Sequence, residues 1–175
     1  MIALAEADPA ELELGYFDQP LRLTDRSDNQ TAVDLLLGQA RQRVELFTPD
    51  MEPWLYDRGE VVEALNRLVL RSRHGRVRVL TIDTERAIKD GHRLIELARR
   101  LSSYIEIRRV HEDYRDTPET FLLADDAGML RRPVSGRPEG QLLLRIPMEV
   151  RQKRAWFDEV WERSTVDPQF RRLYL

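Results

Sequence analysis

The sequence has no cysteine, and this absence excludes disulfide bonds, thiolate nucleophiles and cysteine-based zinc sites. It also has no apolar run near the ~20 residues that a membrane-spanning helix needs. The first residues include several acids and lack the basic and then apolar pattern of a secretory signal. We therefore expect a cytoplasmic protein with no membrane-embedded segment.

Lysine is nearly absent as well. Only Lys89 and Lys153 stand among the 28 lysine and arginine residues, so arginine supplies almost all of the positive charge. Such a ratio is typical of GC-rich bacterial coding, and the alternative is selection for bidentate contacts to phosphate or carboxylate. The arginines are spread along the whole chain, which favours the coding explanation. The formal net charge of −3 argues against nucleic acid or an anionic membrane as a partner.

The length of 175 residues and the hydrophobic content of 42% suit one domain with a sizeable core. Residues 1–28 differ from the rest because they carry seven acidic and two basic side chains. We predict that this acidic stretch is an extension that docks on the domain, either as short edge strands or as a loose cover; the alternative is a free tail. Residues 29–175 are predicted to form a single α/β domain.

Hydrophobic periodicity in this domain first alternates between helix and strand. Ser27 and Gln30 have the spacing of a capping box before the first helix, and Thr84 is placed to cap the third. Helices and strands that alternate at this length predict a mostly parallel sheet with right-handed crossovers. The predicted helices cover residues 30–43, 60–73 and 85–101, and the predicted strands cover residues 44–48, 76–82 and 104–110.

The pattern changes after residue 118, where three short strand candidates follow one another with no helix between them. The first two flank an Asp-Asp-Ala-Gly turn and read as a β-hairpin. We therefore predict an α/β fold: a mixed, mostly parallel sheet flanked by helices, with an antiparallel hairpin near the carboxyl terminus. The three strands are predicted at residues 120–124, 129–133 and 141–146, and a last helix at residues 148–164.

This order of elements, over Val44 to Ser164, resembles one phospholipase D-like domain. FLLADDAG is similar to that superfamily's apolar strand that ends in Asp and a turn. GQLLLRIP followed by AWFDEVWERS is similar to its closing strand and helix. The resemblance implies the phospholipase D-like fold, and it points to uncharacterised bacterial domains of this type.

The chemistry of that superfamily uses His-x-Lys followed by four residues and Asp. The histidine attacks phosphorus, and the lysine neutralises the phosphoryl oxygens. Alignment on Asp125 puts Pro118 at the histidine position and Thr120 at the lysine position. A shift by one residue, onto Asp126, supplies neither group. The resemblance therefore implies a degenerate member that has lost the phosphohistidine chemistry.

Five side chains are candidates for holding an anion. His92 and Arg93 lie early in the third predicted helix, and a helix start favours an anion. Arg109 and Arg131 lie on strand candidates that would each turn one guanidinium toward a phosphate. Asp125 is the one residue of the His-x-Lys-x4-Asp motif that this sequence retains. Each has a structural alternative: a half-buried histidine, surface ion pairs, and an acid that simply suits a turn.

His111 opens a polar loop that contains Glu112, Asp113 and Asp116. Their spacing is poor for a metal site, so we expect a solvated loop. We predict no metal and no cofactor for the chain.

The favoured function is a non-catalytic binding or regulatory module that keeps a vestigial pocket for an anion or phosphate. One alternative is a hydrolase or nuclease that acts on a phosphodiester through His92 or His111 with Asp125. A second alternative is a nucleic-acid-binding module, against which the acidic balance argues. Two motifs meet at one site in the intact superfamily, so the resemblance also implies a homodimer or docking onto a partner domain.

Overall fold

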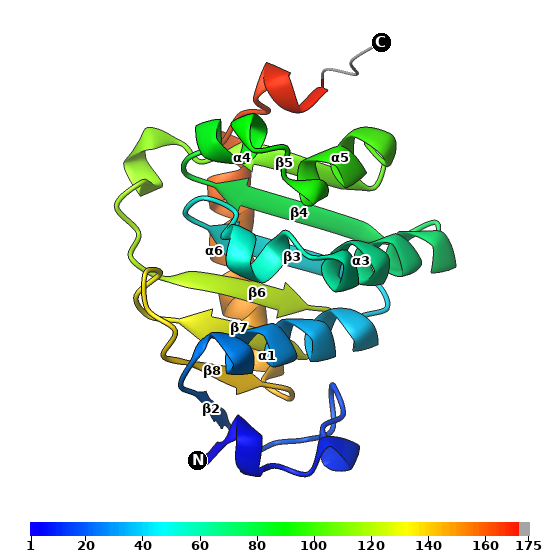
Figure 1. Cartoon of the computed structure of the whole chain (residues 1–175), viewed down its shortest axis with the longest axis vertical. Coiled ribbons are helices and arrows are strands. Elements are labelled where there is room, and N and C mark those ends of the chain that lie inside the picture. The colour runs from blue at the N-terminus through cyan, green and yellow to red at the C-terminus, as the bar shows by residue number, and fades with distance from the viewer. Residues whose placement is uncertain (172–175) are drawn as a thin grey trace.

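The computed structural model describes residues 1–171 and contains one eight-stranded mixed sheet in the order β1-β2-β8-β7-β6-β3-β4-β5 (Figure 1). Strands β3, β4 and β5 are parallel, whereas β6 pairs with β3 in the antiparallel sense and leads through β7 and β8 to β2. The predicted α/β fold with a mixed sheet and a hairpin is confirmed, but the sheet is not mostly parallel, because four of its seven strand pairs are antiparallel. The strands are β1 (Ile2–Ala3), β2 (Leu21–Leu23), β3 (Arg43–Thr48), β4 (Arg76–Thr81), β5 (Ile105–Arg109), β6 (Thr120–Ala124), β7 (Gly128–Arg132) and β8 (Gly140–Leu143).

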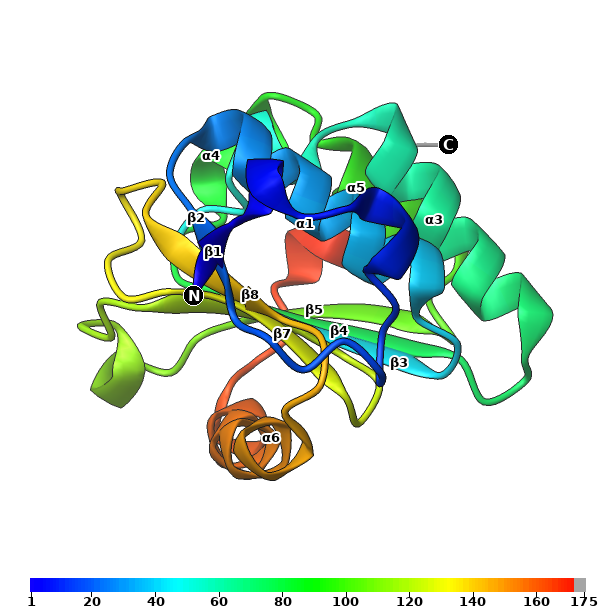
Figure 2. The same cartoon turned by 90° about the horizontal axis from the view of Figure 1, so that it is seen from below.

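Helices cover both faces of the sheet unequally. Figure 2 shows α6 alone on one face and the other α-helices on the opposite face. Four short 3-10 helices complete the fold: η1 (Leu4–Glu6), η2 (Pro9–Glu11), η3 (Glu112–Tyr114) and η4 (Pro168–Arg171). The α-helices are α1 (Arg26–Gln39), α2 (Pro53–Tyr56), α3 (Gly59–Arg71), α4 (Glu85–Lys89), α5 (Arg93–Arg100) and α6 (Pro147–Arg163).

Two hydrophobic cores follow from this layering. Alternate residues of β3 point to opposite faces, so Leu46 joins the larger core under α1, α3 and α5, and Phe47 joins the smaller core under α6. In the smaller core Phe47 stacks on Phe121, and Phe157 stacks on Trp161. Burial of each such side chain contributes roughly 1.5–3 kcal/mol, so α6 is held mainly by its aromatic stripe.

The first helix begins earlier than predicted because a different residue caps it. Asp25 is extended, and its carboxylate accepts a hydrogen bond from the backbone N–H of Asp28 at 2.8 Å. The predicted capping box of Ser27 and Gln30 is therefore wrong, since both residues already lie inside α1.

The predicted helix over residues 85–101 is broken into α4 and α5. Gly91 has a positive φ of 68°, which glycine adopts without strain, and His92 then caps α5. Thr84 occupies the N-cap position of α4, as expected, but its side chain makes no capping hydrogen bond. The Asp83 carboxylate accepts from the N–H of Glu85, whereas Thr84 donates to Asp167.

The acidic amino-terminal stretch lies along one edge of the sheet. Leu4, Leu12 and Leu21 are buried against the main core, and β2 pairs with β8. The boundary between an extension and the domain stays a prediction, and residues 172–175 of the predicted domain lie outside the described residues. Across residues 1–171 no helix is both long and apolar enough to cross a bilayer.

Candidate anion-binding site

A pocket of about 510 Å³ lies where β3 ends, beside the segment that follows β7. In a parallel sheet this carboxyl edge is where ligands usually bind. Its charged lining residues, together with one aromatic ring, are Arg26, Asp50, Glu52, Trp54, Arg86, Arg132 and Arg137.

A strained turn after β3 builds one wall of the pocket. Met51 and Glu52 both have positive φ, at 62° and 29°, which is unfavourable for residues with a side chain. The turn is held because the Met51 side chain is fully buried and the Asp50 carboxylate accepts from the N–H of Glu52 at 3.0 Å. Its effect is to turn the Glu52 carboxylate inward, where the Thr48 hydroxyl donates to it at 3.1 Å.

Arg132 supplies the buried cation of the site. Its side chain is 1% exposed, and one guanidinium nitrogen contacts the Glu52 carboxylate at 2.5 Å. Another nitrogen donates to the Ser135 carbonyl at 3.1 Å. The Nε donor of Arg132 is buried and meets no acceptor among the described residues. Burial raises the pKa of Glu52, although Arg132 and Thr48 act in the opposite direction.

Trp54 lies between two guanidinium groups. The Arg26 group lies 5.0 Å from the ring centroid and the Arg132 group 5.4 Å from it. Arg26 is also the first residue of α1, so the positive end of that helix dipole faces the pocket. With Arg86 and Arg137 added, the exposed rim is dominated by guanidinium groups, which suit phosphate or carboxylate ligands.

The register of the β6–β7 hairpin explains why this cation matters. Arg132 lies directly opposite Thr120, and directly opposed residues share a face of the sheet. Thr120 stands at the position that the resemblance assigns to lysine, and its hydroxyl donates to the Phe47 carbonyl. Arg132 therefore places a positive charge next to the vacated position. Pro118, at the histidine position, contributes only its carbonyl, which accepts from the N–H of Ser135 at 2.8 Å.

His92 lies at the same edge but is used within the fold. It is 2% exposed, its Nε2 donates to the Met51 carbonyl at 2.9 Å, and its Nδ1 accepts from the N–H of Leu94 at 3.1 Å. Burial lowers the pKa of His92, which favours the neutral ring that this pattern needs. Arg93 is exposed, and its N–H donates to Asp57 at 3.0 Å. Neither residue lines the pocket.

Asp125 lies at the opposite, amino edge of β3. It has a positive φ of 52°, and its carboxylate accepts hydrogen bonds from the backbone N–H groups of Arg41, Gln42 and Arg43. The surviving motif residue thus ties the β6–β7 turn to the start of β3.

Arg131 and Arg109 also lie away from the pocket. Arg131 points to the α6 face, where it donates to Gln141 and pairs with Glu149 at 3.0 Å. Arg109 ends β5, and its backbone bonds to Thr165. The five candidate residues are therefore distributed over both edges and both faces of the sheet.

The hydrolase alternative needs a histidine beside Asp125. The six residues of β3 span about 17 Å. His92 bonds to Met51, which follows the carboxyl end of β3, whereas Asp125 bonds to Arg43 at the amino end of this strand. His111 follows β5, and its Nδ1 accepts from the N–H of Asp113. The required convergence is absent, and no cluster of three or more potential metal ligands occurs among the described residues.

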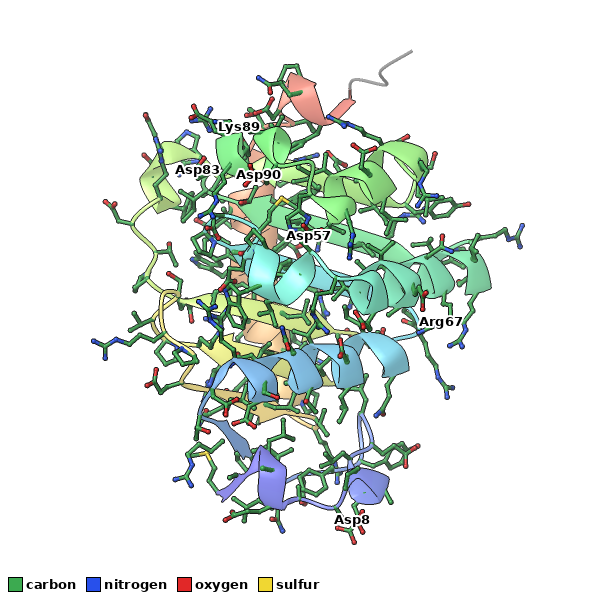
Figure 3. All side chains as sticks on the ribbon, viewed as in Figure 1. Asp8, Asp57, Arg67, Asp83, Lys89 and Asp90 are labelled. Atoms are coloured by element: carbon green, nitrogen blue, oxygen red, sulfur yellow. The ribbon has the colours of Figure 1, made fainter. Side chains whose placement is uncertain are left out.

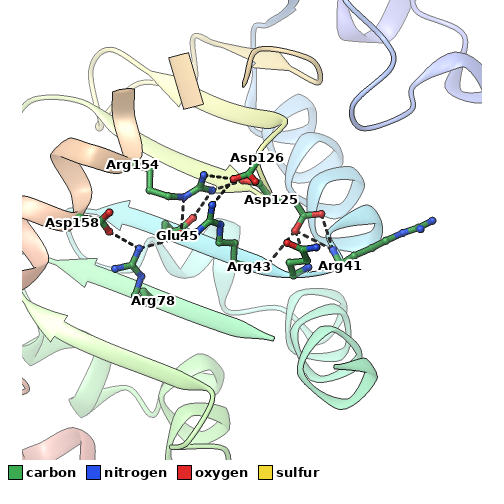
Figure 4. Close-up of polar contacts among 9 residues, drawn as sticks. Arg41, Arg43, Glu45, Arg78, Asp125, Asp126, Arg154 and Asp158 are labelled. Carbon is green, nitrogen blue, oxygen red and sulfur yellow. Dashed lines mark hydrogen bonds and ion pairs between the residues drawn. The ribbon is translucent and has the colours of Figure 1, made fainter. Parts of the chain in front are cut away.

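A second buried ion pair lies on the α6 face (Figure 4). Glu45 of β3 is 1% exposed, and Arg154 of α6 contacts both of its carboxylate oxygens at 3.1 and 3.2 Å. Arg154 also pairs with Asp126 at 2.8 Å, and Arg78 pairs with Glu45 at 3.2 Å. Arg43 hydrogen-bonds to Asp126 and lowers the pKa of that carboxyl. This network joins α6 to the sheet and bonds both carboxylate oxygens of Glu45 to guanidinium groups.

The family described as "Domain of unknown function (DUF7931)" matches residues 25–173. The chain belongs to this family. No curated protein matches the DUF7931 chain.

Solved structures place the DUF7931 domain among phospholipase D-like folds. Nuc from Salmonella typhimurium, a phospholipase D family member, matches with a TM-score of 0.58 and 11% identity, over 85% of this chain and 99% of Nuc. The phosphatidylserine synthase of Haemophilus influenzae matches with a TM-score of 0.59 and 14% identity, over 90% of this chain and 41% of that one. TrmBL2, an archaeal chromatin protein, matches with a TM-score of 0.62 and 12% identity, over 94% of this chain and 57% of TrmBL2. The resemblance inferred from the sequence is confirmed at the level of the fold.

Sequence reasoning missed most of the residues that line the pocket. It chose Arg131 where the pocket contains Arg132. The hairpin register was the available signal, because only Arg132 shares a face with Thr120.

Proposed function

We propose that the DUF7931 chain is a non-catalytic phospholipase D-like module that binds a phosphate-bearing ligand in the pocket at the carboxyl edge. The observation that carries this proposal is Arg132. It restores a cation beside the vacated lysine position, whereas Pro118 leaves the nucleophile position empty. A site with the cation but without the histidine can bind a phosphoryl group and cannot form a phosphohistidine.

The positive charges at the rim of the pocket favour a phosphate over a neutral ligand. Arg26 and Arg137 are exposed, line the pocket and have no carboxylate partner within residues 1–171. Phosphate offers them three or more acceptor oxygens, and charge-assisted bonds are the stronger class of hydrogen bond.

The test compares binding with turnover. Isothermal titration with inorganic phosphate, and with the diester bis(p-nitrophenyl) phosphate, is measured on the wild type and on Arg26→Gln/Arg137→Gln. The rim variant keeps Arg132 and Glu52, so its core ion pair is intact. We expect it to weaken phosphate binding at least tenfold. The matched control Arg109→Gln/Arg115→Gln removes two exposed charges elsewhere and is expected to change the affinity less than twofold.

Hydrolysis of the diester tests whether the module is non-catalytic. The wild type is expected to release no p-nitrophenol above the buffer rate. Hydrolysis that disappears in the rim variant would overturn the proposal, and so would phosphate binding that is equal in all three proteins.

We also propose that the chain works as a homodimer or docks onto a partner domain. What supports this is the superfamily arrangement, in which two motifs share a site, since this chain supplies one motif position. Light scattering across a concentration series tests it. If the protein is a monomer at every concentration, both alone and with phosphate, the homodimer proposal is contradicted.

A further inference from the structure

The amino edge of the parallel strands is rich in positive charge, although the chain as a whole has a negative net charge. Four segments meet there: residues 39–43, 67–76, 99–104 and 124–128. Together they contain eight arginines and two acidic residues, in a chain whose formal net charge is −3. The strand register joins them, because Arg43 lies beside Arg76, and Val77 lies beside Ile105.

Among the described residues, most of these arginines have no carboxylate partner. The two acids at this edge are occupied: Asp125 by backbone N–H groups, and Asp126 by Arg43 and Arg154. Arg99 pairs with Glu96. Within residues 1–171 the other six arginines of these segments form no ion pair, namely Arg41, Arg67, Arg71, Arg73, Arg76 and Arg100. All six are exposed, and Figure 3 shows Arg67 extending from α3 away from the sheet.

Helix dipoles account for only part of this charge. Arg71 and Arg100 lie in the last turns of α3 and α5, where a cation stabilises the negative end of a helix. Arg41, Arg73 and Arg76 lie outside helices, and Arg67 is a full turn further in. The three helix ends at this edge, those of α1, α3 and α5, carry about half a negative charge each, which six guanidinium groups exceed.

One of these six arginines, Arg76, lines a hollow in the surface. A groove of about 880 Å³ runs along the starts of β3, β4 and β5, and the Arg76 guanidinium lies 5.4 Å from the centre of the Tyr104 ring within it. Hydroxyl groups of Ser72, Ser102 and Ser103 add uncharged donors. The acids of the groove are already paired with arginines that are not among the six: Glu45 with Arg154 and Arg78, Asp158 with Arg78, and Glu106 with Arg108.

We propose that this amino-edge groove binds the phosphate backbone of a nucleic acid. Guanidinium groups bind phosphate oxygens in a fork, hydroxyl donors also contact backbone phosphates, and a row of cations over several loops suits a repeating anion. A membrane surface fits less well, because it needs an apolar face to insert, and only Leu70 is a large exposed hydrophobic residue among these segments. This site lies at the opposite end of the strands from the carboxyl-edge pocket.

The experiment measures fluorescence anisotropy of labelled 20-nucleotide single-stranded DNA and 20-base-pair duplex DNA at several salt concentrations. The variant Arg67→Gln/Arg71→Gln/Arg73→Gln removes three of the six arginines at the amino edge that form no ion pair, and Arg71 and Arg73 flank Ser72 of the groove lining. The control Arg22→Gln/Arg109→Gln/Arg115→Gln removes three exposed, unpaired charges from other surfaces.

We expect the wild type to bind at least one of the two DNA probes at low salt, with affinity that falls as salt rises. The Arg67→Gln/Arg71→Gln/Arg73→Gln variant should bind at least tenfold more weakly, and the slope of log affinity against log salt should drop by about 2 to 3, since each phosphate contact contributes about 0.9. The control should change the affinity less than threefold. Absence of wild-type binding overturns the proposal, as do equal losses in the two variants. Binding to phosphatidylserine vesicles in place of DNA also overturns it.

Discussion

The domain contains two buried glutamate–arginine pairs, and they differ in how completely they are satisfied. Glu45–Arg154 lies between the sheet and α6, and neighbouring charges use every group that it offers. Glu52–Arg132 lies at the carboxyl edge, opens onto a pocket and leaves the Nε donor of Arg132 without an acceptor among the described residues. The complete pair joins α6 to the sheet, whereas the incomplete pair is part of the proposed phosphate site.

The first prediction removes the cation of the incomplete pair. Arg132→Met leaves Glu52 buried with only the Thr48 hydroxyl, so we expect the free energy of unfolding at pH 7 to fall by about 3–5 kcal/mol. Urea denaturation measures it. The double variant Glu52→Gln/Arg132→Met removes both charges and should recover most of the loss.

The pH dependence of this stability loss gives a further test of the prediction. Burial already raises the pKa of Glu52, and loss of Arg132 raises it further. A carboxyl whose folded pKa exceeds its unfolded value gains stability as pH falls through the folded value. The deficit of Arg132→Met should therefore shrink between pH 7 and pH 5. A deficit that is constant over this range would mean that Glu52 is solvated in the variant.

The second prediction concerns the complete pair. Arg154→Met leaves Glu45 in contact with Arg78, so we expect a smaller loss, of about 3 kcal/mol, in the same denaturation experiment. Addition of Arg78→Met should then cost more than the sum of the separate changes, because the last partner of Glu45 is gone. A larger loss for Arg154→Met than for Arg132→Met would reverse the comparison.

The third prediction separates fold from ligand at Asp125. Asp125→Ala removes the acceptor of three backbone N–H groups and puts alanine at a positive φ, so we expect a loss of about 2 kcal/mol. Asp125→Asn keeps an acceptor and tolerates this backbone, and it should lose less than half as much. Phosphate affinity should be unchanged in both variants. A tenfold loss of that affinity would place Asp125 in the binding site.

The fourth prediction is a pH effect from His92. Its folded pKa lies below the unfolded value because the ring is buried, so the folded protein resists protonation. Stability should fall as pH drops below about 6.5, the usual unfolded pKa, by on the order of 1 kcal/mol. The variant His92→Asn keeps an acceptor at the helix cap, and subtraction of its pH profile from the wild-type profile isolates the effect. Parallel profiles would contradict it.

Local patterns were sufficient to predict much of the fold. Strand β6 was predicted to the residue because Pro118 and the Asp-Asp-Ala-Gly turn bracket it, and α6 was predicted to within one residue at each end. The break between α4 and α5 was missed because the helical periodicity continues across Gly91, whose positive φ leaves no mark in that periodicity.

The candidate site was harder to predict because it is made by residues far apart in the sequence. Glu52 and Arg132 are 80 positions apart and meet only when β3 and the hairpin join one sheet. The choice between Arg131 and Arg132 depends on strand parity, and a step of one residue moves a side chain to the other face. Neither charge clustering nor motif spacing contains that information.

The pairing of β2 with β8 also has a consequence for how the chain is assembled. Leu21 lies beside Leu142, so a strand made early in synthesis finds its neighbour only after more than a hundred further residues have emerged. Contacts of such long sequence separation slow folding, because a long loop closes before the contact forms. The amino-terminal edge of the sheet is therefore expected to close last, and until then the outer side of β8 is an open template for other chains.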